Sequence, residues 1–293
     1  IINMKIAFDY KVFYLQQHGG VSRYFVSLAN EFIKLNKNIK IFSPIFINEY
    51  LKNNIDKKYY FGKYINRIPL NTRKLFFIYN NLCSRLLLGH WKPTILHNTY
   101  YSENLTSNKK CLKVLTVYDL IHEIYHKDYN YDKNTFPKSR AIKNSDLIFC
   151  PSNKTKKDLI EIYNVEENKI SVVHWGAEDF SNLNEIKIED NIKPYILYVG
   201  DRKRYKNFEN FIKAISKRKI LIDNFKVVCF GGEEFSKKEK ELFLKLNIQN
   251  EKIIRIVGND SMLLSLYRNA KAFIFPSKYE GLGLPPLEAM KQG

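Results

Sequence analysis

Two glutamates and the glycine-rich turn between them are the residues best suited to chemistry in this sequence. Glu280 and Glu288 are separated by seven residues, two of which are glycines. An apolar run, Ala272–Phe275, precedes the turn, and two prolines after it mark the first turn of a helix. Free N–H groups at a helix start bind anions, and nearby carboxylates can bind hydroxyl groups. The pattern predicts a ligand with phosphate and hydroxyls, such as a nucleotide sugar, although two solvated glutamates on a strand–turn–helix would share the spacing.

A dense cluster of cations is the second candidate. The apolar run Tyr195–Val199 ends at Gly200, and four cations follow within six residues, among them Arg202 and Lys206. Fixed positive charge stabilises the negative charge that builds on a diphosphate leaving group. Arginine would supply a two-pronged hydrogen bond and lysine a point charge. A solvated basic loop is the alternative interpretation.

A pair of glycines near the start could also approach a phosphate. Gly19 and Gly20 open a helical pattern, and glycine lets backbone amides come close to a ligand. The motif is not Gly-x-Gly-x-x-Gly, so the dinucleotide-binding fingerprint is absent. Taken alone, such a pair is also compatible with an ordinary turn.

The sharpest competing motif is that of a zinc peptidase. His122-Glu123-Ile-Tyr-His126 matches His-Glu-x-x-His, which needs both histidines one turn apart on a helix. A strand-like run ends at Tyr118, three residues before His122, and the segment 127–134 is turn-like. A helix through the motif is therefore not expected, and two loop histidines without a ligand are the alternative. We expect His97, at another strand end, to be buried and hydrogen-bonded.

The region 52–92 is basic and aromatic, with nine Lys/Arg and one acidic residue. Cations mixed with aromatic side chains suit a membrane surface or an anionic lipid-linked acceptor. The same composition would suit nucleic acid. The favoured interpretation is an amphipathic helix packed on the N-terminal sheet with a solvated basic face, with peripheral membrane contact as the alternative.

Composition sets the broad class. At 293 residues and 45% hydrophobic content, the chain is long enough for two globular domains. The net charge of +18 is spread evenly, which is weak support for nucleic acid, and we expect no nucleic-acid partner. Four scattered cysteines without a Cys-x-x-Cys pair favour a reducing cytosol. No apolar stretch approaches the roughly 20 residues that span a bilayer. We expect a cytoplasmic protein with Met4 as the native start, with the inner face of the membrane as an alternative location.

Short apolar runs alternate with helical patterns along the whole chain, which predicts βαβ units and parallel sheets. The segment 178–194 lacks apolar periodicity and predicts a linker between an N-terminal domain, 1–177, and a second domain, 195–293. The expected strands are Lys5–Phe8, Ile39–Phe42, Thr94–His97, Lys113–Val117, Leu147–Cys150, Ile170–Val173, Tyr195–Val199, Lys226–Phe230, Ile253–Val257 and Ala272–Phe275. The expected helices include Val21–Leu35, Lys154–Tyr163, Asn207–Lys217, Lys237–Leu246, Met262–Asn269 and Leu284–Gln292.

The ordered combination of these motifs resembles the retaining glycosyltransferases of family 4, which have the two-domain GT-B architecture. Their two Rossmann-like domains face each other across a cleft. The resemblance implies that Glu280 lies near the transferred sugar and that Glu288 holds the nucleotide ribose. It also implies that the backbone of Gly281, Leu282 and Gly283 faces the sugar and diphosphate.

The same resemblance implies roles for the other glycines and cations. Gly19 and Gly20 would contact the donor diphosphate or the acceptor. The loop after Gly200 would bind the diphosphate through Arg202 and Lys206. Because the family's arginine more often follows the glycine directly, Arg204 is a rival for the first of these roles.

The resemblance also implies roles for residues at the ends of other strands. Val257 and Ser277 would flank the nucleotide base. Asp119 keeps the place of the family's strand-end aspartate, whereas Tyr118 stands where a histidine usually contacts the sugar. Either the Tyr118 hydroxyl or His122 would then have to supply that contact, and Asp119 or His122 would orient sugar or acceptor.

The resemblance implies a retaining hexosyltransferase that uses a GDP- or UDP-linked sugar. GDP-mannose is favoured because the Gly-Asp-Arg…Tyr-Lys-Asn-Phe loop resembles that of mannosyltransferases of bacterial surface polysaccharides. The acceptor would be a glycan or a lipid-linked glycan in surface polysaccharide synthesis. The resemblance implies front-face transfer in which the departing phosphate helps to deprotonate the acceptor. No metal and no cofactor are expected, because the cations replace a metal at the diphosphate. The chain is expected to end before its second domain is complete. The alternatives are a zinc metallopeptidase, a basic nucleic-acid-binding protein and a sugar-nucleotide epimerase of the same architecture.

Overall fold

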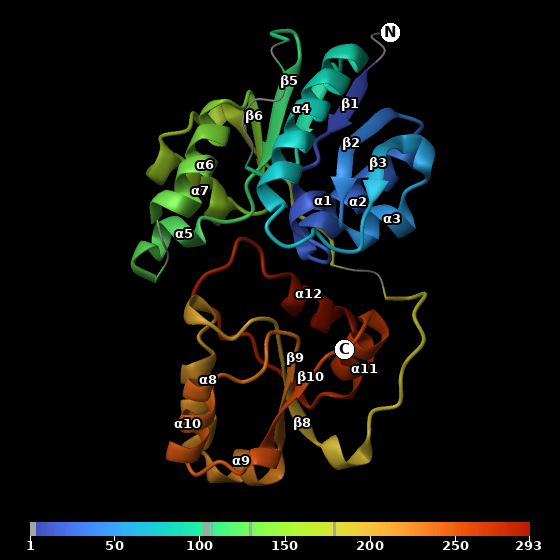
Figure 1. The fold of residues 1–293 in the computed structure, drawn as a ribbon. Coiled ribbons are helices and arrows are strands. Elements are labelled where there is room, and N and C mark those ends of the chain that lie inside the picture. Colours follow the sequence, from blue (N-terminus) through green and yellow to red (C-terminus); the bar gives the residue numbers. More distant parts are fainter. Residues whose placement is uncertain (1–3, 102–105, 107, 129–130, 178–179) are drawn as a thin grey trace. The chain divides into compact units, whose positions relative to one another are not determined.

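The chain folds into two α/β units, seen in Figure 1. The computed structural model describes residues 4–101, 106, 108–128, 131–177 and 180–293. Contacts divide the chain into residues 1–173 and residues 174–293, and each unit has its own sheet. In the described part of the chain, no helix has both the length and the apolar character needed to cross a bilayer.

The first unit is built on a seven-stranded parallel sheet. Its strand order is β3-β2-β1-β4-β5-β6-β7. The strands are β1 (Lys5–Phe8), β2 (Asn38–Phe46), β3 (Tyr60–Tyr64), β4 (Ile95–Asn98), β5 (Leu112–Thr116), β6 (Leu147–Cys150) and β7 (Ile170–Val172). Because every neighbouring pair is parallel, the carboxyl ends of the strands share one edge, where ligands of open α/β sheets gather.

Helices connect these strands. They are α1 (Lys11–Leu15), α2 (Gly20–Lys34), α3 (Glu49–Asn54), α4 (Arg73–Trp91), α5 (Ile121–Ile124), α6 (Tyr131–Lys143) and α7 (Asn153–Tyr163). The start of α6 at Tyr131 corrects the expectation of a turn-like segment over 127–134. Strand β1 is almost fully buried, as expected for a parallel strand covered on both faces.

The edge strand β3 was not predicted, because it lies in the basic and aromatic region and alternates between half-buried and exposed residues. Its pairing with β2 shifts register between Phe42 and Ile45. Gly62 has a φ of 146°, and a Cβ there would lie 1.6 Å from the Ser43 carbonyl oxygen. Only glycine therefore permits this close approach of the two strands.

The second unit has a four-stranded parallel sheet of order β10-β9-β8-β11. The strands are β8 (Tyr195–Val199), β9 (Lys226–Phe230), β10 (Ile253–Ile256) and β11 (Ala272–Phe273), and the helices are α8 (Phe208–Ser216), α9 (Lys219–Asn224), α10 (Lys237–Lys245), α11 (Asp260–Asn269) and α12 (Leu284–Lys291). One apolar cluster lies between the sheet and α8 and α10, and a second lies between the sheet and α11.

The segment expected to link the domains packs on the second unit. Phe180 and Ile188 are buried in the same apolar cluster as Tyr195, Leu197 and Leu264. Burying large apolar side chains stabilises such a segment, so the described part of 178–194 is an integral layer of the second unit. Its lack of periodicity reflects an irregular backbone with only a short 3-10 helix, Asp190–Ile192.

Candidate functional site

The second unit brings two of its loops together at the carboxyl edge of the sheet. The first loop follows β8 and contains Gly200 and a 3-10 turn, Arg204–Lys206, before α8. The second loop runs from the end of β11 to Gly283, where α12 begins. Since β8 and β11 are adjacent parallel strands, both loops leave the sheet at the same edge. This neighbourhood is the candidate site.

Lys206 and Glu280 form the central contact between the two loops. The Lys206 Nζ lies 2.6 Å from Glu280 Oε1, and each side chain keeps 19% of its surface exposed. The backbone N–H of Lys278 donates to the Tyr205 carbonyl at 2.8 Å. The Asn207 side chain donates to the Pro276 carbonyl at 3.0 Å. The two sequence motifs, 74 residues apart in the case of Lys206 and Glu280, therefore meet at one place.

Glu288 is held from the neighbouring helix. The Tyr267 hydroxyl of α11 donates to Glu288 Oε2 at 3.0 Å. Burial, with a smaller contribution from Glu288, raises the pKa of Tyr267, so this phenol stays a hydrogen-bond donor. Tyr267 was not a sequence candidate, because its position in α11 looks like that of any core aromatic residue.

The glycine-rich turn has the backbone that was expected of it. Gly283 has a φ of 86°, and α12 opens with prolines in its first turn. Gly281 is buried, whereas Leu282 and Gly283 are half-buried. Ser277, earlier in the same loop, has a buried Oγ without a hydrogen-bond partner among the described residues. An unsatisfied buried hydroxyl is unfavourable by about 1–3 kcal/mol, so Ser277 keeps an unused hydrogen-bonding group in this loop.

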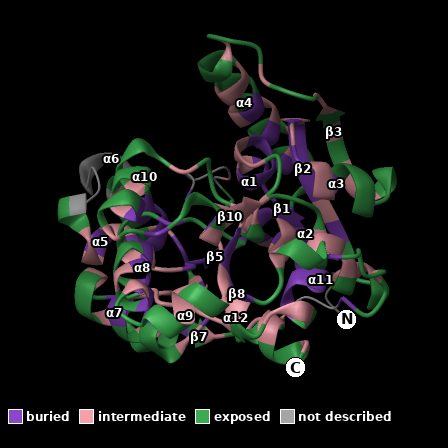
Figure 2. Cartoon of the chain, turned by 90° about the horizontal axis from the view of Figure 1, so that it is seen from below, coloured by how far each residue is buried: buried purple, intermediate pink, exposed green. Residues whose placement is uncertain are grey.

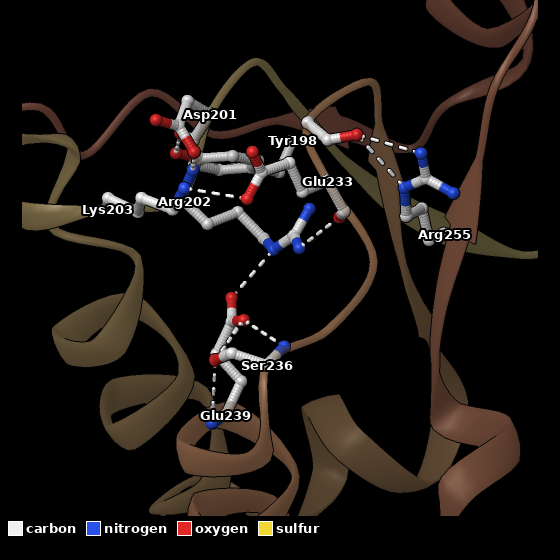
Figure 3. A network of polar contacts seen from close by, with 9 residues as sticks. Tyr198, Asp201, Arg202, Lys203, Glu233, Ser236, Glu239 and Arg255 are labelled. Atoms are coloured by element: carbon white, nitrogen blue, oxygen red, sulfur yellow. Dashed lines mark hydrogen bonds and ion pairs between the residues drawn. The ribbon is translucent and has the colours of Figure 1, made fainter.

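Arg202 is a buried member of a polar network, shown in Figure 3. Its Nε donates to Glu239 Oε1 at 2.8 Å, and its Nη2 donates to the Glu233 carbonyl at 2.6 Å. The guanidinium lies 4.5 Å from the centre of the Phe235 ring, and its side chain is 4% exposed. Contact with a diphosphate would require the guanidinium to leave these partners. Its Nη1 is buried without a hydrogen bond in the described part of the chain.

The partner of Arg202 is itself fixed by a capping box. Ser236 and Glu239 exchange hydrogen bonds at the start of α10, where the Ser-x-x-Glu pattern in the sequence predicts such a cap. Lys203, beside Arg202, pairs instead with Glu233 on the exposed surface at 2.8 Å. The basic loop thus splits its charges: Arg202 points into the unit and Lys203 toward solvent, while Lys206 pairs with the neighbouring loop.

The remaining candidate of the second unit, Val257, follows β10 directly. Its side chain is 58% exposed at the same sheet edge. Gly200, at the end of β8, has a φ of 118°, which suits glycine and turns the chain into the basic loop.

The Gly-Gly motif of the first unit does open a helix. Gly20 is the first residue of α2, and Gly19 precedes it in an extended backbone. The Gln16 side chain accepts a hydrogen bond from the Ser22 N–H at 3.1 Å and so uses one of the free amides. A Cβ on Gly19 would lie 2.4 Å from the same Gln16 oxygen. Glycine at this position therefore makes room for a side chain that caps the helix.

Asp119 and Tyr118 follow β5 in the first unit. The Asp119 carboxylate accepts from the N–H of Ile121, the first residue of the short helix α5, at 3.1 Å. The Tyr118 hydroxyl donates to the Thr99 carbonyl at 3.2 Å, and the residue is 7% exposed. The structure thus gives Tyr118 a hydrogen-bonded place within the unit.

The zinc-peptidase motif does not adopt the geometry that its chemistry needs. Helix α5 ends at Ile124, so His122 lies in α5 whereas His126 begins a 3-10 turn. Glu123 is buried and is paired with Lys138 at 2.9 Å, and its second oxygen accepts from the Tyr163 hydroxyl at 2.7 Å. A glutamate held in this way is not available as a general base, and the motif is a coincidence of sequence.

His97 is a core residue, as expected. Its Nε2 lies 2.9 Å from the Thr116 hydroxyl, and aromatic rings surround it. Complete burial lowers the pKa of His97 to about 3, so the ring is neutral at physiological pH.

Curated relatives match this chain, among them two kinds of mannosyltransferase. One is an O-antigen chain mannosyltransferase, RfbU, of Salmonella typhimurium, 26% identical over 221 residues that cover 74% of this chain. Another is a serotype-specific mannosyltransferase, WbdA, of Escherichia coli, 26% identical over 221 residues that cover 67% of this chain. The matches span 59% of RfbU and 26% of WbdA, so the chain corresponds to part of each relative's length.

Solved structures show the same fold. A glycosyltransferase from Rickettsia africae superposes with a TM-score of 0.66 at 21% identity, over 100% of this chain and 78% of that one. Anabaena HepE, solved with UDP and glucose, gives a TM-score of 0.65 at 12% identity, over 99% of this chain and 78% of that one. The two parallel sheets and these likenesses confirm the expected α/β class of GT-B type.

Family comparison covers both units. Residues 179–293 match the family described as glycosyl transferases group 1. Residues 18–179, more than half of the chain, match Glycosyltransferase Family 4. The family suggested by the order of the motifs is thereby confirmed, and the chain belongs to glycosyltransferase family 4.

Proposed function

We propose that this chain carries the donor-binding and acceptor-side units of a retaining glycosyltransferase that moves a hexose from a nucleotide sugar to a glycan or lipid-linked acceptor. The observation that carries the proposal is the contact between Lys206 and Glu280, which joins a cationic loop to a glycine-rich loop at the carboxyl edge of the second sheet. Family membership supports the same class of reaction.

Lys206 is the proposed partner of the donor diphosphate. An ammonium group can donate three hydrogen bonds, and Glu280 accepts one of them. The other donors can reach phosphate oxygens while the carboxylate keeps the cation in place. As the glycosidic bond breaks, negative charge grows on the phosphate, and a preplaced cation stabilises it without reorganisation. The departing phosphate then assists removal of the acceptor proton, as in front-face transfer.

Glu280 and Glu288 are the proposed hydroxyl ligands. Glu280, held by Lys206, would accept from the transferred sugar, and Glu288, held by Tyr267, would accept from the ribose. The buried Ser277 hydroxyl and the exposed Val257 are the proposed contacts of the nucleotide base. Two carboxylates fixed by separate partners give a ligand two defined hydrogen-bonding points.

Arg202 is better suited to positioning the basic loop than to direct phosphate contact. Its guanidinium connects that loop to Glu239 and to the Glu233 carbonyl, and it is nearly inaccessible. Breaking these bonds to reach a phosphate would leave Glu239 without its cation. We therefore assign Lys206 the leading electrostatic role in the second unit.

The first unit supplies the proposed acceptor side. Gly19 and Gly20 at the start of α2, and Asp119 with His122 after β5, all follow carboxyl ends of strands in one sheet. We propose that these loops orient the acceptor or the sugar, with Asp119 keeping α5 in place.

GDP-mannose is the proposed donor, with UDP sugars as the competing class. RfbU is named as an O-antigen chain mannosyltransferase and WbdA as a serotype-specific mannosyltransferase, and these relatives support mannose as the sugar and surface polysaccharide as the product. The UDP bound to HepE keeps the second class open to test. The free cysteines accord with a reducing, cytoplasmic site of action.

Titration calorimetry with GDP and UDP tests this proposal. Lys206→Ala and Glu288→Ala should each weaken binding of the preferred nucleotide at least tenfold. Lys203→Ala, which removes a cation of the same loop that pairs on the surface, is the matched control and should change affinity less than twofold. If Lys206→Ala and Lys203→Ala bind alike, or if neither nucleotide binds the parent chain, the assigned donor site is wrong.

A further inference from the structure

Helix α4 (Arg73–Trp91) presents an apolar face to solvent. Five side chains at helical spacing, Leu75, Ile78, Tyr79, Leu82 and Leu86, are between 47% and 75% exposed. Residues that recur at intervals of three and four share one side of a helix, so they form a continuous stripe, here called the outer stripe. Soluble proteins seldom leave such a stripe uncovered, and where they do it marks an interaction surface.

The opposite face of α4 packs into the core of the first unit through apolar side chains, and two polar side chains lie among them. The Asn80 side chain accepts from the Ile45 N–H at 2.7 Å and donates to the Ile45 carbonyl at 2.9 Å. The Ser84 hydroxyl donates to the Phe42 carbonyl, and both side chains are fully buried. These backbone groups belong to the two residues between which the pairing of β2 with β3 shifts register. Apolar packing and these hydrogen bonds together fix the inner face of the helix, and the outer stripe is left on the opposite side.

Cations surround the outer stripe. Residues 57–92 contain eight Lys/Arg and no Asp or Glu. Lys74 and Arg85 are exposed and eleven residues apart, which places both along one flank of the stripe. Leu70, three residues before the helix, is 93% exposed. Figure 2 shows exposed, intermediate and buried residues along the length of α4. This corrects the expectation of a basic solvated face: the outer face is apolar with a basic border.

We propose that the outer stripe of α4 docks on an anionic phospholipid surface. Aliphatic side chains flanked by cations fit the boundary between acyl chains and acidic headgroups, where the helix lies in the membrane plane. A second copy of this chain fits less well as the partner. If two copies met through this surface, the eight cations of residues 57–92 in one copy would face the same eight cations in the other and repel them. A nucleic acid would leave the aliphatic stripe in water. The inference does not depend on the proposed transfer reaction.

Vesicle co-sedimentation without any nucleotide sugar tests the proposal. The parent chain should bind vesicles of phosphatidylglycerol and phosphatidylcholine, and bind pure phosphatidylcholine much more weakly. The triple variant Leu75→Gln/Leu82→Gln/Leu86→Gln leaves the net charge unchanged and should weaken binding at least tenfold. The matched triple Leu35→Gln/Ile220→Gln/Leu244→Gln removes exposed apolar side chains elsewhere and should change affinity less than twofold. Equal melting temperatures establish that both variants fold.

A second measurement reports the contact itself. Leu86→Trp keeps the stripe apolar, and its fluorescence should shift to shorter wavelength with anionic vesicles, whereas that of Leu244→Trp should not. If neither triple weakens binding, net charge alone drives it, and the proposal is overturned. Equal weakening by both triples would show that exposed apolar side chains contribute wherever they lie, and would overturn it as well. So would a parent chain that ignores anionic vesicles. A parent dimer that the stripe variant dissociates, with vesicle binding unchanged, would assign the stripe to a second copy.

Discussion

Two lysine–glutamate ion pairs in this protein have similar N–O distances but differ in how far they are exposed to solvent. In the first unit, Lys138 and Glu123 are 2.9 Å apart and each side chain is 1% exposed; we refer to them as the sealed pair. In the second unit, Lys206 and Glu280 are 2.6 Å apart and each is 19% exposed; they form the open pair. The chemistry of the two pairs is the same, but their access to a ligand differs.

The sealed pair uses its hydrogen-bonding capacity within the unit. Lys138 also donates to the Asp119 carbonyl at 3.1 Å and lies 5.1 Å from the centre of the Tyr101 ring. Glu123 accepts from the Tyr163 hydroxyl as well. The open pair, in contrast, joins two loops and remains within reach of solvent. Burial thus makes one pair structural and leaves the other able to contact a ligand, although it is the sealed glutamate that lies in a catalytic-looking motif.

Breaking the sealed pair should have the largest effect. Lys138→Ala leaves the Glu123 charge buried and unpaired, and we expect a loss of about 3–5 kcal/mol in the free energy of unfolding. Urea denaturation measures this loss. Glu123→Leu/Lys138→Met, which removes both charges, should recover most of it. A single variant as stable as the parent chain would show that the pair is not sealed.

Arg202→Met should have the next largest effect, about 1.5–3 kcal/mol of unfolding free energy, because Glu239 and the Glu233 carbonyl lose a charged donor. Methionine keeps apolar contact with Phe235. Parallel urea denaturation and GDP titration separate positioning from direct contact. Unchanged stability with tenfold weaker GDP binding would assign Arg202 to the phosphate instead.

His97 extends the comparison to a single sealed group. Its folded pKa of about 3 lies below the unfolded value near 6.5, so the unfolded state binds more protons between these limits. Its contribution to stability is therefore complete above pH 6.5 and is lost as the pH falls toward 3, by at most about 1.4 kcal/mol per pH unit. Unfolding free energies at pH 7, 6 and 5 should fall less steeply for His97→Leu than for the parent chain. Parallel slopes would contradict a neutral buried ring.

The open pair should contribute least to stability. Lys206→Ala should lower the unfolding free energy by less than about 1 kcal/mol, since partly exposed pairs contribute little. Chemical denaturation of Lys206→Ala beside Lys138→Ala gives the direct contrast. A Lys206 variant as destabilised as the Lys138 variant would place both pairs in the same structural class.

Strand positions could be read from the sequence with good accuracy. The bounds of β1, β6, β8 and β9 agree with the expected runs, because parallel strands covered on both faces consist almost wholly of apolar residues. The edge strand β3 was missed, since its residues alternate and one is a lysine. A helix was expected in the region of α4, but its outward face was not. The helix carries apolar residues on both sides, and the side that packs on the core is chosen by contacts with distant segments, among them the hydrogen bonds of Asn80 and Ser84.

The sequence could predict which residues belong to the candidate site, but not which residues they contact. The motifs around Lys206, Glu280 and Glu288 stand out by spacing, charge and turn-forming residues, which are local properties. The inward position of Arg202 depends on Glu239, 37 residues away, and the support of Glu288 depends on Tyr267. No local sequence pattern around Glu239 or Tyr267 indicates that they contact Arg202 and Glu288.

The sequence by itself determined the α/β class, the parallel strands and the motifs of family 4, because burial patterns and short-range spacing are written along the chain. The tertiary structure decided which charges are sealed and which are open, and which side of α4 meets solvent. The physical reason is that exposure and charge pairing arise between segments far apart in the chain, and an ammonium or carboxylate changes its role with its surroundings.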